Sequence, residues 1–346
     1  MLAARLMSPG CLVIGECASP ECPEKGVLVR VKSCGLCAAD ARMVQTGHPA
    51  LSYPRIPGHE LTGTIEESRV ENIQPGLRVQ VPPGLSCGVC RYCLRGDDHQ
   101  CLQREVFGFS RDGGFAELIP VPLHGPLRAE VLELPQEVDF RLGIMAEPVA
   151  CCLNAQSKLD LRSSDRVLIM GGGIMGVLHA LAAQAKGVTD LAVCEPLPER
   201  RRIAAGCGVD KVLDPAKDEL RQGVMDWTEG MGVDVIVLAS SDVTLGLEIL
   251  GLLARGGRLS VFSGGMPAGN GVGTLLSTVH YQEFQITGAY GCRRRDNRAA
   301  LECIAERPAL FSGLIDNVTG LVEVEQGLRQ TRNRTSLKAV MEVERG

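Results

Sequence analysis

The chain has 346 residues, of which 45% are hydrophobic, 22% are charged and 3% are aromatic, and its formal net charge at pH 7 is -5. This length exceeds the size at which a single hydrophobic core keeps growing, so we expect two domains. The lack of a basic excess argues against nucleic acid or an anionic membrane as the main partner, and no apolar stretch approaches the length of a membrane span.

The N-terminal sequence and the cysteine content bear on the cellular compartment. Arg5 and Pro9 interrupt what would have to be the apolar region of a secretory signal peptide. The chain has fifteen cysteines, an odd number, and a reducing compartment keeps such residues as thiols or metal ligands. We therefore expect a cytoplasmic protein.

The first 150 residues are rich in glycine and proline, and the segment 26–32, Gly-Val-Leu-Val-Arg-Val-Lys, alternates in the manner of a strand. This pattern predicts an irregular β domain. Cys37 and the pair His59 and Glu60 lie on two loops of this domain and offer one sulfur, one nitrogen and one oxygen ligand. Three protein ligands leave an open coordination position, which a catalytic zinc needs for its substrate.

Glu147, which precedes Pro148, offers a further carboxylate that would bind the same ion directly or through water. Each of these residues is weak evidence by itself. A lone histidine such as His59 is more often a surface or core residue, and Cys34 with Cys37 also fits a redox pair or two buried thiols. Their order along the chain, together with the two features described next, favours a metal site.

Four cysteines then lie close together, at Cys87, Cys90, Cys93 and Cys101, with the spacing C-x2-C-x2-C-x7-C. Four thiolates fill the tetrahedral shell of Zn²⁺ and leave no position for a substrate, so we predict a structural zinc in a lobe at residues 84–102. An iron–sulfur cluster is the alternative. The bacterial cluster motif has three residues before its last cysteine and a proline after it, whereas here seven residues intervene and a leucine follows.

From about residue 158 to residue 290, short apolar segments alternate with helical stretches. Continuously apolar strands are covered on both faces, and their separation by helices indicates a parallel, doubly wound sheet. The predicted strands are Arg166–Met170, Asp190–Cys194, Asp234–Leu238 and Arg258–Phe262.

The first of these strands leads directly into Gly171-Gly-Gly173-Ile174-Met175-Gly176, and an apolar helical stretch follows at 177–185. This G-x-G-x-x-G motif, placed between a strand and a helix, predicts a dinucleotide site. Gly171 permits the tight turn, Gly173 lets the backbone approach a pyrophosphate, and Gly176 lets the helix pack closely on the strand. The helix N-terminus adds N–H groups that bind the phosphates.

Glu195 ends the next predicted strand, nineteen residues after Gly176. A carboxylate at this point accepts hydrogen bonds from ribose hydroxyls and repels a 2′-phosphate, which favours NAD over NADP. Arg200 is near enough in sequence either to flank the adenosine or to soften that repulsion. His179, inside the helical stretch, is predicted to be a packing residue.

The last segment of the chain, after residue 291, is too short to form a core of its own. The sequence predicts helices near Asp296–Glu306 and Glu323–Thr331 and a strand at Lys338–Val343. We expect this segment to pack back on a neighbouring domain.

Together these motifs resemble the zinc-dependent medium-chain alcohol dehydrogenase family over essentially the whole chain, and most closely its polyol branch of sorbitol, threonine and galactitol-phosphate dehydrogenases. The resemblance implies an α/β protein. A GroES-like, β-rich catalytic domain would span residues 1–152 and 292–346, with a Rossmann NAD-binding domain inserted at residues 153–291. The matching segments are Gly35-Leu-Cys37-x-x-Asp40, Gly58-His59-Glu60, the lobe cysteines, Asp112-Gly-Gly-Phe-Ala-Glu117, Glu147-Pro148 and Gly171–Gly176.

The resemblance also implies roles for individual residues. Cys37, His59 and Glu60 would hold the catalytic zinc, with Glu147 as a near or fourth ligand. Asp40 would bind the distal nitrogen of His59 and fix its tautomer, as outer partners of metal-bound histidines do. With the lobe zinc, each chain would carry two zinc ions and bind NAD. The implied assembly is a homodimer or homotetramer, with the segment 284–288 near the seam between nucleotide domains.

Two positions depart from the family pattern. Many relatives have Ser or Thr two residues after the metal-binding cysteine, where the hydroxyl relays the substrate proton, but this chain has Ala39. Water, Glu147, the cofactor ribose or a hydroxyl of the substrate would then take that role. Threonine dehydrogenases have a histidine three residues before the first lobe cysteine, where this chain has Gly84, which argues against threonine.

The pattern as a whole predicts reversible oxidation of a secondary alcohol, with hydride transfer to NAD. A polyol, a sugar alcohol or its phosphate, and an amino alcohol remain open as substrates. The alternative is a non-catalytic or metal-free nucleotide-binding member of the same superfamily. Pocket candidates, by analogy with relatives, are Phe109, Arg111, Tyr290 and the run 293–295, and His48, Tyr53 and Arg55 are candidates for the mouth. The three arginines of 293–295 fit either a phosphate site or a solvated segment before a helix.

Overall fold

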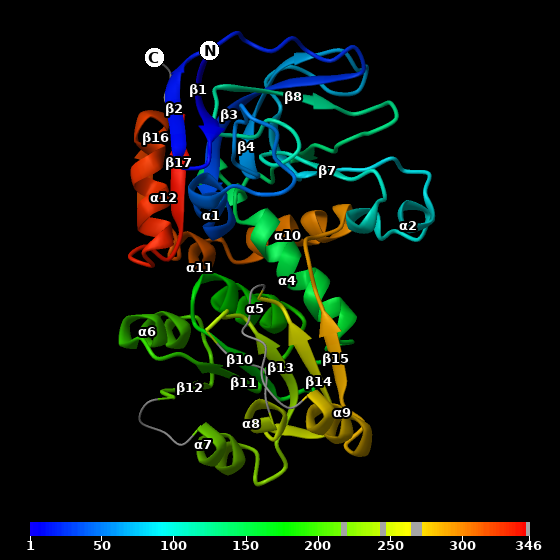
Figure 1. Cartoon of the computed structure of the whole chain (residues 1–346), viewed down its shortest axis with the longest axis vertical. Coiled ribbons are helices and arrows are strands. Elements are labelled where there is room, and N and C mark those ends of the chain that lie inside the picture. The colour runs from blue at the N-terminus through cyan, green and yellow to red at the C-terminus, as the bar shows by residue number, and fades with distance from the viewer. Residues whose placement is uncertain (216–219, 243–246, 264–271, 344–346) are drawn as a thin grey trace. The chain divides into compact units, whose positions relative to one another are not determined.

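The computed structural model describes residues 1–215, 220–242, 247–263 and 272–343 (Figure 1). The chain divides into two compact units, one made of Met1–Ala150 with Cys292–Gly346 and the other of Cys151–Gly291. The second unit is therefore inserted between two sequence segments of the first. Among the described residues, no helix combines the length and the apolar character needed to cross a membrane.

A seven-stranded sheet forms the core of the first unit, in the order β16-β17-β3-β4-β5-β9, with β8 also paired to β3. All its neighbouring strands are antiparallel except β16 and β17, which are parallel. Its strands are β3 (Gly26–Leu36), β4 (Glu60–Ser68), β5 (Arg78–Val81), β8 (Leu118–Pro122), β9 (Leu132–Glu133), β16 (Asn317–Gly320) and β17 (Ala339–Glu342). Two strand pairs lie outside it, namely β1 (Leu2–Ser8) with β2 (Cys11–Glu16) and β6 (Gly84–Leu85) with β7 (Glu105–Val106).

The C-terminal segment packs back on the first unit, as expected from its size. Strand β17 pairs with β3, and Val324 and Met341 belong to the same buried cluster as Val29 and Val31. The helices of this unit are α1 (Ala38–Thr46), α2 (Arg91–Leu94), α3 (Phe140–Gly143), α10 (Arg294–Glu306), α11 (Pro308–Ser312) and α12 (Val324–Arg332), with single 3₁₀ turns η1 (Asp98–Gln100) and η2 (Leu321–Glu323). Helix α4 (Ala146–Lys158) carries the chain into the second unit.

The second unit is built on a six-stranded, wholly parallel sheet in the order β12-β11-β10-β13-β14-β15. Numbered within the unit, this order reads 3-2-1-4-5-6, which is the strand order of dinucleotide-binding domains. The strands are β10 (Val167–Met170), β11 (Leu191–Cys194), β12 (Lys211–Leu213), β13 (Val233–Leu238), β14 (Leu253–Val261) and β15 (Gln285–Gly288).

Both faces of this sheet are buried, which explains why its strands read as continuous apolar runs. In β10, Leu168 belongs to one buried cluster and Ile169 to another, because successive side chains of a strand point to opposite faces. Ala180 of α5 lies in the cluster with Ile169, and Val224 of α7 lies in the cluster with Leu168. The helices are α5 (Ile174–Ala185), α6 (Pro198–Gly206), α7 (Leu220–Trp227), α8 (Leu247–Leu250) and α9 (Val272–Tyr281). The expectation of a doubly wound sheet is confirmed.

His179 is a packing residue of α5, as the sequence predicted. It is fully buried, and its ring lies edge-on to Phe262 with centroids 4.5 Å apart. Among the described residues, neither ring nitrogen has a hydrogen-bond partner. Burial, with a smaller contribution from the charge of Lys186, lowers the pKa of His179 to about 3. The folded protein therefore holds this imidazole in the neutral form.

We expect His179→Leu to make the stability of the protein less sensitive to acid. The unfolded chain takes up a proton on this histidine below pH about 6.5, whereas the folded chain does not until pH about 3, so stability falls as the pH drops through this window. At pH 5 the term amounts to about 2 kcal/mol. Urea unfolding at pH 7 and pH 5 measures it, with the exposed His280→Leu as the control. Equal pH sensitivity in the parent and His179→Leu proteins would contradict the assignment.

Candidate active site

Two neighbouring strands bring Cys37, His59 and Glu60 together. Cys37 directly follows β3 and caps the N-terminus of α1, while Glu60 begins β4. Since Gly35 of β3 pairs with Glu60, the end of one strand lies beside the start of the other. The ligand atoms of the three residues lie within 4.8 Å of one another. One sulfur, one nitrogen and one oxygen at this spacing fit a zinc ion with a coordination position left for a substrate.

Asp40 orients His59 from behind. Its side chain is fully buried, and its Oδ1 lies 3.1 Å from Nδ1 of His59, while its Oδ2 accepts a hydrogen bond of 3.3 Å from the backbone N–H of Cys37. An N–H at Nδ1 directed to this carboxylate leaves Nε2 of the imidazole with a lone pair for a metal. Burial lowers the pKa of His59, but the Asp40 carboxylate and the Cys37 thiol raise it more, so the pKa lies well above its usual value. The ring is thus a strongly basic ligand.

The surroundings of Cys34 favour a buried thiol over one half of a redox pair with Cys37. The two are not joined by a disulfide, and Cys34 is fully buried. Its sulfur packs against glycines, because a Cβ on Gly58 or Gly114 would lie 2.9 or 3.0 Å from it. Burial, followed by the charges of Asp40 and Glu60, raises the pKa of the Cys34 thiol well above its usual value. An inert, protonated thiol is the form that this site favours.

Lys338 also contacts this site, although no motif in the sequence marked it as a site residue. Its ammonium forms an ion pair with Oε2 of Glu60, and both side chains are almost wholly buried, with 4% and 2% of their surface exposed. Burial lowers the pKa of Lys338, but the charges of Glu60 and Cys37 raise it, and the net shift is upward. The only hint in the sequence is a single cation at the start of a predicted strand whose next three residues are apolar.

Glu147 lies on the first turn of α4 and is buried, with 9% of its surface exposed. Its carboxylate does not join the group formed by Cys37, His59 and Glu60; it lies within 4.8 Å of the sulfur of Cys292. Its negative charge nevertheless acts on Lys338. Glu147 is therefore near the three ligands without being one of a compact set of four.

Aromatic rings border the site. The ring of Phe109 lies 5.4 Å from that of His59 and 5.3 Å from that of His48, measured between centroids. His48 is exposed, and its Nδ1 accepts a hydrogen bond of 3.1 Å from the backbone N–H of Ala50. Of the pocket candidates, Phe109 is thus beside a metal ligand, and His48 is next to Phe109 at the surface of the unit.

Arg55, Arg111 and Arg293, three of the arginines proposed for the pocket or its mouth, form ion pairs within the first unit. Arg111 forms an ion pair with Glu105, and Arg55 with Asp112. The guanidinium of Arg293 is buried and makes two hydrogen bonds to the Asp296 carboxylate, at 2.7 and 2.8 Å. The interpretation of the run 293–295 as a solvated segment is therefore wrong for Arg293, which is buried and paired, whereas Arg295 is exposed. The pairing of Arg293 with Asp296 does not fit a phosphate site at that residue.

The four lobe cysteines converge as a structural zinc site requires. Their sulfurs lie within 4.8 Å of one another, with neighbouring S···S distances of 3.5 to 3.9 Å. A tetrahedron of sulfurs at a Zn–S distance of about 2.3 Å has edges of about 3.8 Å, so the cage has the right size. Backbone N–H groups of Cys90 and Gln103 donate to the sulfurs of Cys87 and Cys101, which stabilises thiolates there. Hydrogen bonds from the backbone of Cys93 and Leu102 lower the pKa of Cys90 to about 6.

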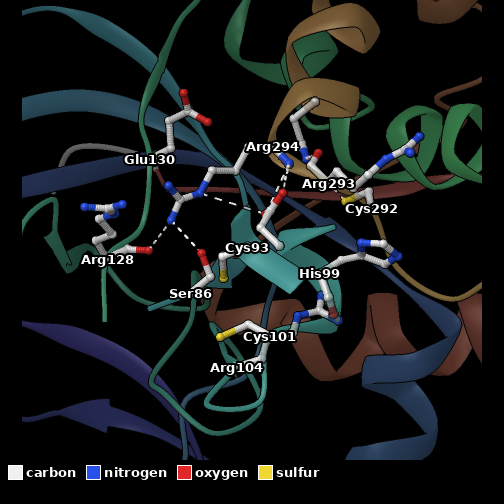
Figure 2. A network of polar contacts seen from close by, with 12 residues as sticks. Ser86, Cys93, His99, Cys101, Arg104, Arg128, Glu130, Cys292, Arg293 and Arg294 are labelled. Atoms are coloured by element: carbon white, nitrogen blue, oxygen red, sulfur yellow. Dashed lines mark hydrogen bonds and ion pairs between the residues drawn. The ribbon is translucent and has the colours of Figure 1, made fainter. Parts of the chain in front are cut away.

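Arg294 fastens this lobe to the rest of the first unit (Figure 2). Its guanidinium donates to Oγ of Ser86 at 3.0 Å and to the carbonyl of Arg128 at 2.6 Å. Its backbone N–H lies 3.3 Å from Oδ1 of Asp98, a residue between the third and fourth lobe cysteines. The lobe is thus held at both ends by the first residue of α10.

The glycine motif of the second unit adopts a phosphate-binding geometry. Gly171 has φ +111, a conformation that favours glycine. Gly173 is the N-cap residue of α5. A Cβ on Gly176 would lie 1.8 Å from the carbonyl oxygen of Gly171, so only glycine allows the helix to approach the loop this closely. Ile174 and Met175 form the first helical turn, whose N–H groups point towards the loop.

Glu195 faces this loop from the end of β11. It is buried, and its carboxylate accepts hydrogen bonds from the backbone N–H groups of Gly172, at 2.7 Å, and Leu197, at 2.9 Å. Arg200 also lies near this loop, since a Cβ on Gly173 would be 3.5 Å from Nη1 of Arg200. A carboxylate and a guanidinium therefore flank the same loop.

Comparison with protein families and curated proteins accounts for both units. The family models "Alcohol dehydrogenase GroES-like domain" and "Zinc-binding dehydrogenase" match residues 23–134 and 174–306. An uncharacterized zinc-type alcohol dehydrogenase-like protein of Haemophilus influenzae is 31% identical over 238 residues, 68% of each chain. An L-threonine 3-dehydrogenase of Mesorhizobium japonicum is 26% identical over 334 residues, 94% of each chain.

Solved structures agree with these matches. An alcohol dehydrogenase from Thermotoga maritima superposes with a TM-score of 0.92 at 25% identity, over 99% of both chains. A putative zinc-binding dehydrogenase from Sinorhizobium meliloti, bound to NADP, gives a TM-score of 0.86 at 25% identity, over 99% of this chain and 98% of that one. With a GroES-like unit, a Rossmann unit and zinc-type relatives along its length, the chain belongs to the zinc-dependent medium-chain alcohol dehydrogenase family, in its polyol branch.

Proposed function

We propose that this protein oxidises a secondary alcohol of a small polyol to a ketone, with NAD as the hydride acceptor and a zinc ion held by Cys37, His59 and Glu60. The observation that carries the proposal is the convergence of these three ligand atoms within 4.8 Å, with Asp40 buried behind the histidine. A soft thiolate, an imidazole and a carboxylate with one position left over is a ligand set that suits catalytic zinc.

The residues of the chain hold the zinc ion and position the groups that react. When bound, zinc lowers the pKa of the substrate hydroxyl, and NAD accepts the carbinol hydrogen as hydride. Cys37, His59 and Glu60 hold the ion from strand ends, and Asp40 keeps the imidazole of His59 in one orientation. Because β3 and β4 are paired in the sheet, these ligands are held in place without rearrangement.

The proton released from the alcohol needs an acceptor other than residue 39. Ala39 has no hydroxyl, whereas Glu147 places a buried carboxylate close enough to act on Lys338. We assign to Glu147 the role of proton acceptor or of an additional metal ligand. Neighbouring hydroxyls of a polyol would assist this transfer, as expected for a substrate that carries its own relay.

We propose an uncharged polyol as the substrate. A phosphorylated one would need a free cationic group, and the carboxylates of Glu105 and Asp296 already neutralise Arg111 and Arg293. Phe109 presents an apolar ring beside His59, which suits the carbon skeleton of a small alcohol. Gly84 stands where threonine dehydrogenases have a histidine, which supports a substrate other than threonine.

The cofactor assignment rests on Glu195. Its buried carboxylate lies at the glycine loop, where it repels a 2′-phosphate and accepts hydrogen bonds from ribose hydroxyls, so we propose NAD over NADP. The nearby charge of Arg200 would reduce that repulsion, but the Glu195 carboxylate still lies at the loop and still favours NAD. The four lobe cysteines would hold a second, structural zinc.

We also propose that two nucleotide-binding units join through β15, to form a homodimer or a dimer of dimers in the cytoplasm. This strand is at the edge of the six-stranded sheet, and three of its four residues are exposed. The backbone of an edge strand is available for pairing with a second copy. The segment 284–288 predicted from the sequence coincides with this edge.

An NAD-coupled screen of zinc-replete protein tests the function. Polyols, their phosphates and amino alcohols are compared at equal concentration, with NAD and with NADP, by following absorbance of the reduced cofactor. We expect reduction of NAD with an unphosphorylated polyol and at least about tenfold lower kcat/KM with NADP, since repulsion between the Glu195 carboxylate and a 2′-phosphate should cost about 1.4 kcal/mol or more. No reduction of either cofactor by any alcohol would contradict the proposal.

A further inference from the structure

Lys338 and Glu60 form an ion pair across β3, the strand that leads directly into the metal ligand Cys37. Strand β3 is the middle one of three, with β4 on one side and β17 on the other. Gly35 of β3 pairs with Glu60 of β4 and with Val340 of β17, and Leu36 pairs with Ala339. Lys338 immediately precedes Ala339, so the chain places it beside Cys37, the residue that follows Leu36.

Gly35 makes the contact between the flanking strands possible. A Cβ on Gly35 would lie 1.8 Å from Oε2 of Glu60, so the carboxylate occupies the space that any other side chain would fill. The same oxygen is the one that binds the Lys338 ammonium. The Glu60 carboxylate is thus drawn across the strand towards Lys338, at the position where the chain has no side chain to block it.

Negative groups surround the Lys338 ammonium and stabilise its charge. Cys37, Glu60 and Glu147 all act on it, and each contributes a negative group in the state that would bind zinc. Removing a buried ion from water is costly, so a lone ammonium is retained here only with close opposite charges. A dication and this ammonium are therefore rivals for the oxygens of one carboxylate.

We infer that Lys338 is a positioning residue which shares the Glu60 carboxylate with the catalytic zinc and so weakens the hold of the protein on that ion. This inference depends on the proposed zinc site of Cys37, His59 and Glu60. A carboxylate held partly by an ammonium donates less charge to the metal, and the ammonium itself repels the dication. The metal then stays more electrophilic towards a substrate oxygen.

The experiment compares Lys338→Met with Lys338→Arg. We expect zinc at the catalytic site to be released at least tenfold more slowly to a chelator from Lys338→Met, and Lys338→Arg to resemble the parent protein. In the cobalt-substituted proteins, the visible absorption bands should shift in Lys338→Met and remain in Lys338→Arg. These readouts concern the metal alone and need no turnover.

A matched control separates this effect from the loss of any buried pair. Arg293 and Asp296 also form a buried pair in the same unit, with 8% of each side chain exposed, and Arg293→Met should leave zinc release unchanged. Combining Lys338→Met with Glu60→Gln should abolish the difference, because no carboxylate remains to be shared. If Lys338→Met fails to fold, Lys338→Gln gives the same comparison with a neutral hydrogen-bond donor.

The outcomes distinguish the inference from the function on which it rests. If the parent protein binds only one zinc per chain, the proposed catalytic zinc site is wrong, and the inference loses its basis. Two zinc ions per chain, with equal or faster release from Lys338→Met or Lys338→Gln, would overturn the role of Lys338 while leaving the zinc site intact.

Discussion

Replacing Cys37 with alanine is expected to reduce turnover by at least about 1000-fold and to lower the zinc content from two ions per chain to one. The metal supplies several kcal/mol of charge stabilisation, and each 1.36 kcal/mol is a factor of ten in rate. Cys37 is the only thiolate among the three converging ligands, so His59 and Glu60 alone leave a weak site. Steady-state kinetics and metal analysis of the same preparation measure both effects.

NAD binding should survive this change, because the glycine loop and Glu195 belong to the other unit of the chain. Cys34→Ala is the matched control, since it removes a buried thiol three residues away that is not one of the converging ligand atoms. Its zinc content should stay at two. Full activity of a Cys37→Ala protein with one zinc would rule out the proposed chemistry, and a parent protein with one zinc would favour the non-catalytic alternative.

The sequence was sufficient for those parts of the site whose residues are close together along the chain. The spacing of the lobe cysteines allows one tetrahedral cage, and in the structure their sulfurs lie within 4.8 Å of one another. The motif Gly171–Gly176 determines a turn and a helix start within six residues, and Gly176 contacts Gly171 directly. The strands of the Rossmann unit were recognisable because burial of both faces makes them apolar throughout.

Contacts between distant segments were not predictable in the same way. Lys338 is 278 residues from Glu60, and their contact depends on β17 pairing with β3, which no local pattern specifies. The three arginines at 293–295 look alike in the sequence, yet the fold gives Arg293 a carboxylate three residues away and Arg294 partners in the zinc lobe. Strand β12 has only three residues, too few for a recognisable alternation.

Replacing Cys93 with serine is expected to remove the lobe zinc and to destabilise the protein strongly. Its sulfur lies 3.5 Å from that of Cys90 and 3.9 Å from that of Cys87, so it is a central member of the cage. Without a metal, burial raises the pKa of Cys93 to about 12, which shows that this thiolate is costly when no cation is present. A hydroxyl is a poor zinc ligand in place of a thiolate, so the remaining sulfurs hold the ion weakly.

The loss of stability follows from what the zinc holds together. The lobe has little apolar core, since Val89, Leu94 and Leu102 are each more than 70% exposed, and its order depends on the cage and on the Arg294 contacts. We expect a loss of at least about 3 kcal/mol, or about 6 to 12 °C in the unfolding temperature. Calorimetry and metal analysis measure it, with the buried thiol change Cys22→Ser as the control. Because the catalytic ligands are a separate group of residues, zinc at that site should remain at one ion per chain. An unchanged total of two would show that the lobe cysteines do not bind zinc.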